Sequence, residues 1–366
     1  MLAAILLLQV APPPADLLPV APDVPCAVAS DQPASTFRVQ LTPEQDNRAK
    51  RVYQRSIVIT AHDHCFHPAD FKDSDRVGIT ARTIKVTVDG HYRLGAKRYS
   101  IESEVAGWEE RRKKALALLD HEIESSGGRL MHIRRVDDIV QAKRGGKLGI
   151  VLSFEGGRPL AGKIENLKMF YELGLRELQL YWAVPSALKN SDGTLSAFGA
   201  AVIRETNRLG IVTDFSHMPD AAFRQAVEIT KHPVLISHCA VAKVSGVPAR
   251  GTDQLDDDTI RAVARTGGVI CLHFYEGYIR PSRGPHATVE DLVDHMEYIK
   301  RIAGIDHIGL GLDFFPEKGW RWIEGAERMP LLSNVAREMV RRGFTDQEIE
   351  KVLGRNLMRL YERVWK

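Results

Sequence analysis

This chain of 366 residues is poor in several features that mark particular classes of protein. It has only four cysteines and no C-x-x-C pair, which argues against a disulfide-stabilised framework. Its formal net charge is +3, without a basic stripe interleaved with aromatic residues, so the sequence makes no case for nucleic-acid binding. What is plentiful is hydrophobic residues, at 44%, enough for the core of one large barrel or of two ordinary domains.

The N-terminal segment lacks the length to cross a bilayer well. Residues 1–11 are apolar except for Gln9 and precede three prolines, a pattern that resembles part of a secretory signal, although no Lys or Arg comes before it. We expect export, for example to a periplasm, ahead of two alternatives: an apolar leader without a targeting role in a cytoplasmic protein, or a misassigned start codon. We therefore interpret residues 1–37 as leader and Pro/Ala-rich linker and residues 38–366 as a single domain, and we expect no stable transmembrane anchor.

From about residue 41 the sequence alternates between short apolar strands and longer amphipathic helices. About eight strand–helix repeats favour a parallel sheet covered by helices and closed as a (β/α)8 TIM-like barrel. An open doubly wound sheet is the alternative, weakened because no Gly-x-Gly-x-x-Gly turn follows the first strand. The expected strands are 56–61, 83–88, 148–154, 175–181, 210–216, 234–237, 268–273 and 308–312. The expected helices are 104–125, 162–172, 196–208, 219–230, 257–265, 288–303 and 345–363, with an N-cap at Asp256.

Several of these strands end next to a side chain that can bind a metal ion. These side chains are His62 and His64, then Glu155, His217, His238 and Asp313, each at the end of a different later strand. The C-terminal ends of barrel strands meet at one face, where active sites are built, so we expect these residues to converge on one pocket. A pocket lined with imidazoles and carboxylates is typical of zinc or a similar divalent ion.

Each of these residues also has an ordinary structural explanation. Alternate residues on a strand share a face, so His62 and His64 can grip one ion, but two core or surface histidines explain the pair about as well. Glu155 precedes two glycines and fits a turn as well as a ligand that shares its two oxygens between two metals. His217 and His238, taken singly, fit a packed core as well as a metal site. Taken together, the five strand-end positions in one barrel face favour the metal site.

The cysteines are expected to have structural roles. Cys65, Cys239 and Cys271 lie at or near predicted strand ends, where small buried thiols are the ordinary interpretation. Cys65 and Cys239 directly follow two of the candidate histidines, so a thiolate ligand is the less favoured alternative.

Asp313 would complete the chemistry of this pocket. A carboxylate near the metals can take a proton from a bound water and pass it to a leaving group. Metal binding lowers the pKa of that water toward ~7. The reaction class that follows is metal-assisted hydrolysis, most naturally of an amide or an ester.

Longer motifs surround the candidate residues. They are LSFEGG at 152–157, NRLGIVTDFSH at 207–217, ISH at 236–238, IGLGLD at 308–313 and LGRN at 353–356. On these motifs the chain, from about Ser56 to Arg363, resembles the membrane (renal) dipeptidases, peptidase family M19, which are zinc-dependent (β/α)8 hydrolases.

The resemblance implies a role for each candidate residue. His62 would bind a first zinc ion, Glu155 would bridge both ions, and His217 and His238 would hold the second. Asp313 matches the catalytic carboxylate of the family. Arg250 falls near the arginine that grips the C-terminal carboxylate of the substrate, with a spacing that slips by one residue.

Three positions depart from the family pattern. His64 stands where the family carries an aspartate ligand. Trp182 stands where the family places a histidine that polarises the scissile carbonyl, and its indole N–H can donate only one neutral hydrogen bond. His273 stands where the family tends to carry asparagine; it either compensates for the lost histidine or packs at a strand end.

We therefore expect a metal-dependent, dipeptidase-like hydrolase that cleaves an amide bond of a small carboxylate-bearing substrate with metal-activated hydroxide. The expected cofactor is one or two zinc ions, with another divalent metal as the alternative. The alternative functions are an amidase or lactonase acting on a non-dipeptide substrate, and a catalytically impaired homologue that only binds metal or ligand. The expected partners are a dipeptide or other small molecule and, as a further option, a second copy of the chain in a homodimer.

Overall fold

The computed structural model describes residues 32–65, 68–88, 93–94, 97–98, 116–117, 119–182, 186–280, 286–315 and 319–366. The predicted leader up to residue 31 and residues 104–115 of the predicted helix 104–125 lie outside these ranges, whereas residues 116–117 and 119–125 are helical. The domain boundary after residue 37 stays a prediction; on its N-terminal side, Gln32 Nε2 donates to the Trp322 carbonyl oxygen at 2.8 Å. Within these ranges no helix combines the length and the apolar character that crossing a bilayer requires.

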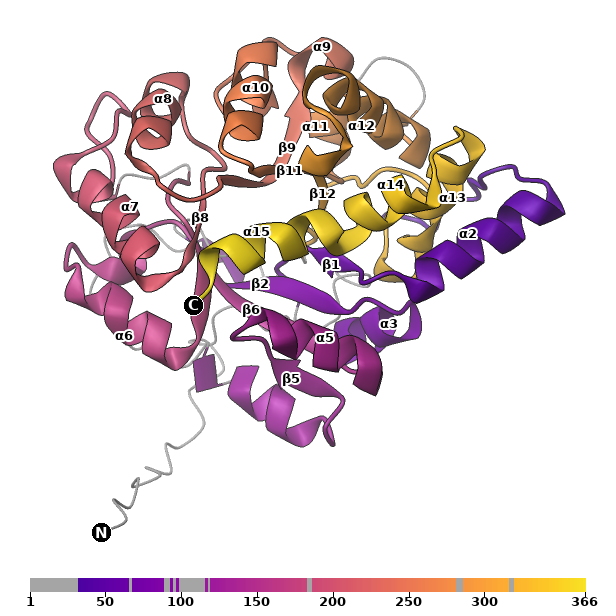
Figure 1. The fold of residues 1–366 in the computed structure, drawn as a ribbon, viewed down its shortest axis with the longest axis horizontal. Helices are drawn as coiled ribbons and strands as arrows, with labels where there is room; N and C mark the ends of the chain where they lie inside the picture. Colours follow the sequence, from indigo (N-terminus) through magenta and orange to yellow (C-terminus); the bar gives the residue numbers. More distant parts are fainter. Residues whose placement is uncertain are drawn as a thin grey trace.

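Eight parallel strands close into a barrel, which confirms the predicted fold class (Figure 1). Two pairings close the ring: Asp214 pairs with Leu235 between β8 and β9, and Thr60 pairs with Leu310 between β1 and β12. The open doubly wound alternative is therefore wrong. In order around the barrel the strands are β1 (Ile59–Thr60), β2 (Ala81–Val88), β6 (Leu148–Glu155), β7 (Leu175–Gln179), β8 (Val212–Asp214), β9 (Leu235–Val241), β11 (Val269–His273) and β12 (Ile308–Gly311).

Further short strands attach to the barrel or lie apart from it. β5 (Leu130–His132) pairs with β6, and β10 (Gln254–Leu255) pairs with β9. β3 (Arg93–Leu94) and β4 (Lys97–Arg98) pair with each other, and among the described residues they form a separate two-stranded sheet.

Helices cover the outside of the barrel and match most of the predicted ones within a few residues. Asp256 caps its helix as predicted, since its side chain accepts from the Thr259 N–H. The predicted helix 345–363 is interrupted by a π-helical stretch, Lys351–Arg355, between α14 and α15. The α-helices are α2 (Pro43–Arg55), α3 (Pro68–Arg76), α5 (Val136–Gly145), α6 (Glu165–Leu173), α7 (Ala197–Leu209), α8 (Asp220–Ile229), α9 (Ala242–Ser245), α10 (Asp257–Arg265), α11 (Glu276–Ile279), α12 (Val289–Ala303), α13 (Ser333–Arg341), α14 (Asp346–Glu350) and α15 (Asn356–Val364).

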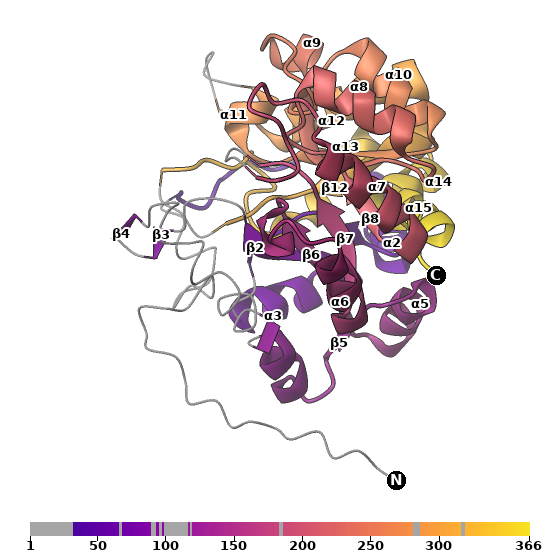
Figure 2. The same ribbon diagram turned by 90° about the vertical axis from the view of Figure 1, so that its left-hand side faces the viewer.

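The apolar core has two parts. The larger part lies between the outer face of the barrel and the helices. The smaller part lies inside the barrel, where Ile59, Val151 and Leu235 pack with Leu357 and Leu360 of α15. The C-terminal helix α15 thus closes the barrel end at which the strands begin, and it crosses the front of the barrel in Figure 1. In the side view, β3 and β4 lie on the opposite side from α15, toward the end at which the strands finish (Figure 2).

The pairing of β9 with β11 contains a bulge beside the candidate site. Ile236 pairs with Ile270 and Cys239 pairs with Leu272, so two residues of β9, Ser237 and His238, face a single residue of β11. The sequence pattern ended this strand at residue 237, and that boundary is wrong, because β9 continues to Val241. The extra residue re-aims the side chains at this point, which is a common use of a bulge near an active site.

The fit of β12 against β9 gives the first prediction. A Cβ atom at Gly311 would overlap the carbonyl oxygen of Ser237. We expect Gly311→Ala to push β9 outward and to lower stability by roughly 1–3 kcal/mol, the usual cost of overpacking. Thermal and denaturant unfolding measure this change. In the control Gly145→Ala, the added methyl meets only the Lys147 side chain at ordinary contact distance, so stability should hold or rise slightly. Equal stability of both variants would contradict the close packing.

Candidate metal centre

The structure brings the six predicted donors together at the barrel end opposite α15. They are His62 and His64 after β1, Glu155 in β6, His217 after β8, His238 in β9 and Asp313 after β12. All are buried except His217, which keeps partial exposure. Residues separated by up to about 250 positions in the sequence therefore face one another, as the barrel prediction requires.

The first group of donor atoms lies around His62, His64 and Asp313. The Nε2 atoms of the two histidines are 3.1 Å apart, and Asp313 Oδ1 lies 3.3 Å from the first and 3.0 Å from the second. Glu155 Oε2 lies 3.3 Å from His64 Nε2 and 3.8 Å from His62 Nε2. Tetrahedral zinc with ligands at about 2.0–2.1 Å separates its ligand atoms by about 3.3 Å. The spacing therefore fits one ion among these four side chains.

The second group of donor atoms consists of His217, His238 and the other oxygen of Glu155. The Nε2 atoms of the two imidazoles are 2.9 Å apart, and Glu155 Oε1 lies 3.5 Å from His217 Nε2. On the far side of the His217 ring, Asp253 Oδ1 lies 2.7 Å from Nδ1. A carboxylate on the remote ring nitrogen is typical of metal-binding histidines, because it fixes the tautomer that presents a lone pair to the ion.

Glu155 lies between the two groups. Its Oε2 faces His62 and His64, whereas its Oε1 faces His217 and accepts a hydrogen bond from Gln179 Nε2 at 3.0 Å. One carboxylate oxygen in each group is the geometry that a bridge between two ions needs. The bridging role itself stays a prediction.

Nearby carboxylates raise the pKa values of two imidazoles in this cluster. Burial lowers the pKa of His62, but the charges of Asp313 and Glu155 outweigh it and raise the pKa to about 9. Burial also lowers the pKa of His217, and Asp253 together with Glu155 raises it to about 10. In the protein without metal, both imidazoles are therefore cations at neutral pH.

The other charges respond to these cations. Burial raises the pKa of Glu155, yet His62 and His217 hold it well below its usual range. Burial likewise raises the pKa of Asp313, but the cation at His62 and the hydrogen bond from His273 hold it well below its usual range. The pKa of His238 is held well below normal, first by burial and then by the cation at His62. Two ionised carboxylates among imidazoles fit divalent cations, which bind by displacing imidazole protons.

Backbone strain concentrates at the same place. Among the non-glycine residues in the described part of the chain, only Ala161, His217 and Asp313 have positive φ angles, 63° for His217 and 52° for Asp313. The left-handed conformation costs a non-glycine residue roughly 1–3 kcal/mol and persists where the surroundings enforce it, often at functional sites. Two of the six donors are thus held in a conformation that local preference alone disfavours.

The hydroxyl of Ser237 contacts one histidine of each donor group. Ser237 Oγ lies 2.9 Å from His62 Nδ1 and 3.0 Å from His238 Nδ1. If both rings present Nε2 to an ion, each Nδ1 carries a hydrogen and donates it to Ser237 Oγ. The Ser237 hydroxyl can then donate to Ser216 Oγ at 3.2 Å, and Ser216 Oγ donates to Asp214 Oδ1 at 2.8 Å.

This chain of hydrogen bonds ends on a buried lysine inside the barrel. Lys85 Nζ lies 3.1 Å from Asp214 Oδ2 and 2.8 Å from Glu177 Oε1, and all three side chains are fully buried. Burial lowers the pKa of Lys85, but Glu177 and Asp214 outweigh it and raise the pKa. The lysine keeps its charge and anchors Asp214, which in turn accepts from the backbone N–H of Ser216 and of Ser237.

Ion pairs connect one of the two predicted substrate-binding residues, Arg250, to the donors. Arg250 Nη2 pairs with Asp253 Oδ2 at 3.0 Å, and its side chain is 68% exposed. The pairing connects the guanidinium through Asp253 to His217. Trp182 is partly exposed and follows β7, and its carbonyl oxygen accepts from Lys189 Nζ at 2.7 Å.

From the sequence we expect His273 either to compensate for the histidine missing at Trp182 or to pack at a strand end, and its contacts favour a role within the protein. Its Nε2 atom lies 2.9 Å from Asp313 Oδ2, and its Nδ1 atom accepts from the backbone N–H of Tyr275 at 2.9 Å. Both ring nitrogens are therefore engaged within the protein.

The cysteine predictions hold in part. Cys239 and Cys271 are free and buried, as expected. Cys65 is disulfide-bonded, so the expectation of a buried thiol at this position is wrong, and its sulfur is withdrawn from the set of metal ligands. Four scattered cysteines do not reveal a pairing from sequence, because pairing depends on how the chain folds back. Burial raises the pKa of the Cys239 thiol well above its usual range, which disfavours a thiolate ligand there too.

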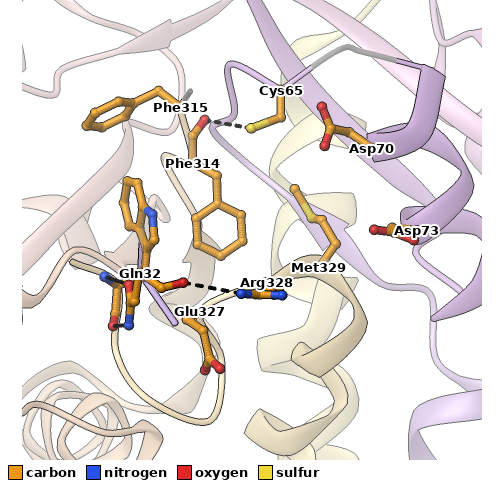
Figure 3. Close-up of a pocket in the computed structure, with 10 residues that line it drawn as sticks. Gln32, Cys65, Asp70, Asp73, Phe314, Phe315, Glu327, Arg328 and Met329 are labelled. Atoms are coloured by element: carbon orange, nitrogen blue, oxygen red, sulfur yellow. Dashed lines mark hydrogen bonds between the residues drawn. The ribbon is translucent and has the colours of Figure 1, made fainter. Parts of the chain in front are cut away.

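A small pocket lies beside the donor groups rather than at them. Figure 3 shows Phe314 and Phe315, directly after Asp313, with the Phe314 carbonyl oxygen 3.2 Å from Cys65 Sγ. Gln32 closes another side of the pocket, and its carbonyl oxygen accepts from Arg328 Nη2 at 3.2 Å. None of the six donors lines this pocket. The pocket lies where the segment after β12 (Phe314, Phe315) meets the segment after β1 (Cys65).

Sequence reasoning missed the residues that hold the donors. Asp253, Ser237 and Gln179 each contact a candidate ligand, but no single-residue pattern distinguishes them from ordinary polar residues. One signal was present: a Ser-His pair ends two different predicted strands, at 216–217 and 237–238. Both serines belong to the hydrogen-bond chain that leads to Asp214.

Comparison with known proteins identifies the family. The family profile of the membrane dipeptidases (peptidase family M19) matches residues 47–366. The chain belongs to this family. An uncharacterized dipeptidase of Schizosaccharomyces pombe is 31% identical over 242 residues, which are 63% of this chain and 56% of the yeast protein. The chain thus matches little more than half the length of that relative.

Solved structures share the fold of this M19 protein. An amidohydrolase from Pseudomonas aeruginosa has a TM-score of 0.76 and 22% identity over 87% of this chain and 99% of its own. The probable dipeptidase PvdM from the same organism has a TM-score of 0.78 and 18% identity over 88% and 99%. A metallopeptidase from Rhodobacter sphaeroides, bound to a phosphinate mimic of the dipeptide L-Ala-D-Ala, has a TM-score of 0.72 and 18% identity over 85% and 100%.

The position of Glu155 gives the second prediction. We expect Glu155→Ala to abolish tight binding of at least one ion, because this side chain supplies an oxygen to both donor groups. Metal analysis of the desalted, zinc-loaded protein gives the stoichiometry. A suitable control is Glu338→Ala, which removes another fully buried carboxylate, one that pairs with Arg341 and Arg342 far along the chain. Full metal content in Glu155→Ala would show that the site is misplaced.

Proposed function

We propose that this M19 protein is a zinc-dependent hydrolase that cleaves the amide bond of a dipeptide or of another small substrate bearing a carboxylate. The observation that carries the proposal is Glu155, which directs one oxygen to each of two imidazole-rich donor groups. The family membership supports a dipeptidase-like metallohydrolase, and the Rhodobacter relative with its dipeptide mimic supports the substrate class.

The residues divide the chemistry among them. His62, His64, Asp313 and Glu155 would hold one ion, and His217, His238 and Glu155 the other. Such ions supply Lewis acidity and lower the pKa of a water molecule toward neutrality. The partial exposure of His217 marks the side from which substrate approaches.

Asp313 and Arg250 act on the substrate in this proposal. Asp313 is held as a carboxylate by its surroundings, so it can take up a proton and return it to the leaving amine. Arg250 Nη2 pairs with Asp253, and its guanidinium is largely exposed, so further N–H groups can reach a substrate carboxylate. Asp253 thereby connects substrate binding to the orientation of His217.

Two other functions remain candidates on specific grounds. An amidase or lactonase of a non-dipeptide substrate is favoured by His64 and Trp182, since neither matches the dipeptidase pattern. A homologue that binds metal without turnover is favoured by the same two residues. Turnover of a dipeptide panel by zinc-loaded protein, alongside simple amides and lactones, separates the three.

Trp182 gives the third prediction. If this position has lost a carbonyl-polarising histidine, ordinary L,L-dipeptides should be poor substrates, by ~10²–10³ in turnover, the usual worth of an oxyanion donor. Trp182→His should raise dipeptide turnover, alone or together with His64→Asp, at unchanged metal content. Wild-type turnover equal to that of an efficient dipeptidase would refute this role. Activity absent from every variant with metals bound would favour a different substrate or a protein that only binds metal.

A further inference from the structure

His273 is a buried histidine at the end of β11 that the proposed reaction does not yet use. It is 3% exposed and packs beside His238, with ring centroids 5.3 Å apart. Its ligand atom also lies within 4.8 Å of those of His238 and Asp313, close enough for the three to form a metal-binding group by distance alone. The hydrogen bonds of the ring point to a different role.

The backbone of Tyr275 decides which nitrogen of His273 carries the hydrogen. The Tyr275 N–H lies 2.9 Å from Nδ1 and can only donate, so Nδ1 must accept with its lone pair. In a neutral imidazole the hydrogen is then on Nε2. This Nε2–H points at Asp313 Oδ2, 2.9 Å away. With that tautomer, neither ring nitrogen has a lone pair to offer an ion.

The same hydrogen bond separates the tasks of the two oxygens of Asp313. Oδ2 is held by His273, while Oδ1 lies 3.0 Å from His64 Nε2 and 3.3 Å from His62 Nε2. A carboxylate rotates readily about its Cβ–Cγ bond, and such rotation would carry Oδ1 out of the first donor group. A donor fixed on Oδ2 prevents this rotation.

We propose that His273 is a positioning residue, whose Nε2–H holds Asp313 Oδ2 so that Oδ1 stays within the first donor group. This rests on the proposed function, because it requires that the first donor group binds an ion. It makes His273 neither a metal ligand nor a donor to the substrate.

Two substitutions of His273 test whether the hydrogen bond to Asp313 matters independently of the imidazole ring. The amide nitrogen of glutamine lies as many bonds from Cα as Nε2 of histidine, so His273→Gln can keep a hydrogen bond to Asp313. The amide nitrogen of asparagine matches only Nδ1, so His273→Asn leaves Oδ2 without this donor. Should His273→Asn not fold, His273→Ser removes the same donor with a smaller side chain.

His295 offers a matched control. It is fully buried, its Nδ1 atom accepts from the Val241 N–H at 3.0 Å, and its Nε2 atom lies 3.0 Å from the Ile279 carbonyl oxygen. It therefore has the same hydrogen-bond pattern as His273 but contacts no metal donor. His295→Gln reports what the loss of any buried histidine does to metal binding through stability alone.

The test is the affinity of each purified variant for Zn²⁺ by chelator competition, together with the visible spectrum of the Co²⁺-loaded protein. We expect His273→Asn to weaken one of two ions about 10- to 100-fold, the usual effect of losing such a supporting contact, and to change the Co²⁺ spectrum. His273→Gln and His295→Gln should stay within about threefold of wild type.

Three results would overturn the inference: wild-type affinity in His273→Asn, an equal loss in His273→Gln, or an equal loss in His295→Gln. If the wild-type protein itself bound neither ion, the proposed function would fail first and the role of His273 with it.

Discussion

The placement of one buried carboxylate, Glu155, governs the rest of this site. Removing a carboxylate from water is unfavourable unless opposite charge and hydrogen bonds compensate. Here imidazoles approach each of its oxygens, and Gln179 donates to one of them. Because the two oxygens point to different groups, a single side chain contacts both donor groups and fixes how they lie relative to each other. The histidines His62, His64 and His217 each lie within 3.8 Å of one of its oxygens.

Strained and irregular backbone positions several of the other donor side chains. His217 and Asp313 adopt positive φ angles, and a bulge in β9 places Ser237 and His238 opposite a single residue of β11. Below the donors, Ser237 contacts one histidine from each group, and the charged pair of Lys85 and Asp214 anchors the chain of hydrogen bonds. The two donor groups are therefore connected through Ser237 as well as through Glu155.

Sequence patterns predicted the fold and the set of histidines and carboxylates that meet at one barrel end, but not the contacts that orient them. Alternating strands and helices, with histidines and carboxylates at strand ends, suffice for a barrel with a pocket at one end, because chain direction fixes where parallel strands finish. The bulge in β9 was missed, since it depends on how β9 pairs with β11. The disulfide at Cys65 was missed for a similar reason, and Asp253 was missed because its contact with His217 depends on the path of a loop.

The structure shows what the residues that depart from the family pattern contact. His64 replaces an expected carboxylate, so the first group keeps the carboxylates of Asp313 and Glu155, which lie 3.0 Å and 3.3 Å from His64 Nε2. His273 looked like a substitute for the histidine missing at Trp182, but both of its ring nitrogens are engaged by Asp313 and Tyr275. His64 and His273, which depart from the family pattern at the ends of two different strands, thus both contact Asp313.

The most direct test of this account is an anomalous-scattering map from crystals of the zinc-loaded protein, recorded on both sides of the zinc absorption edge. The account predicts two peaks about 3.5–4 Å apart, a spacing typical of two-metal sites, with one oxygen of Glu155 directed to each. One peak lies beside His62, His64 and Asp313, and the other beside His217 and His238. A single peak, or peaks that Glu155 does not connect, would contradict it.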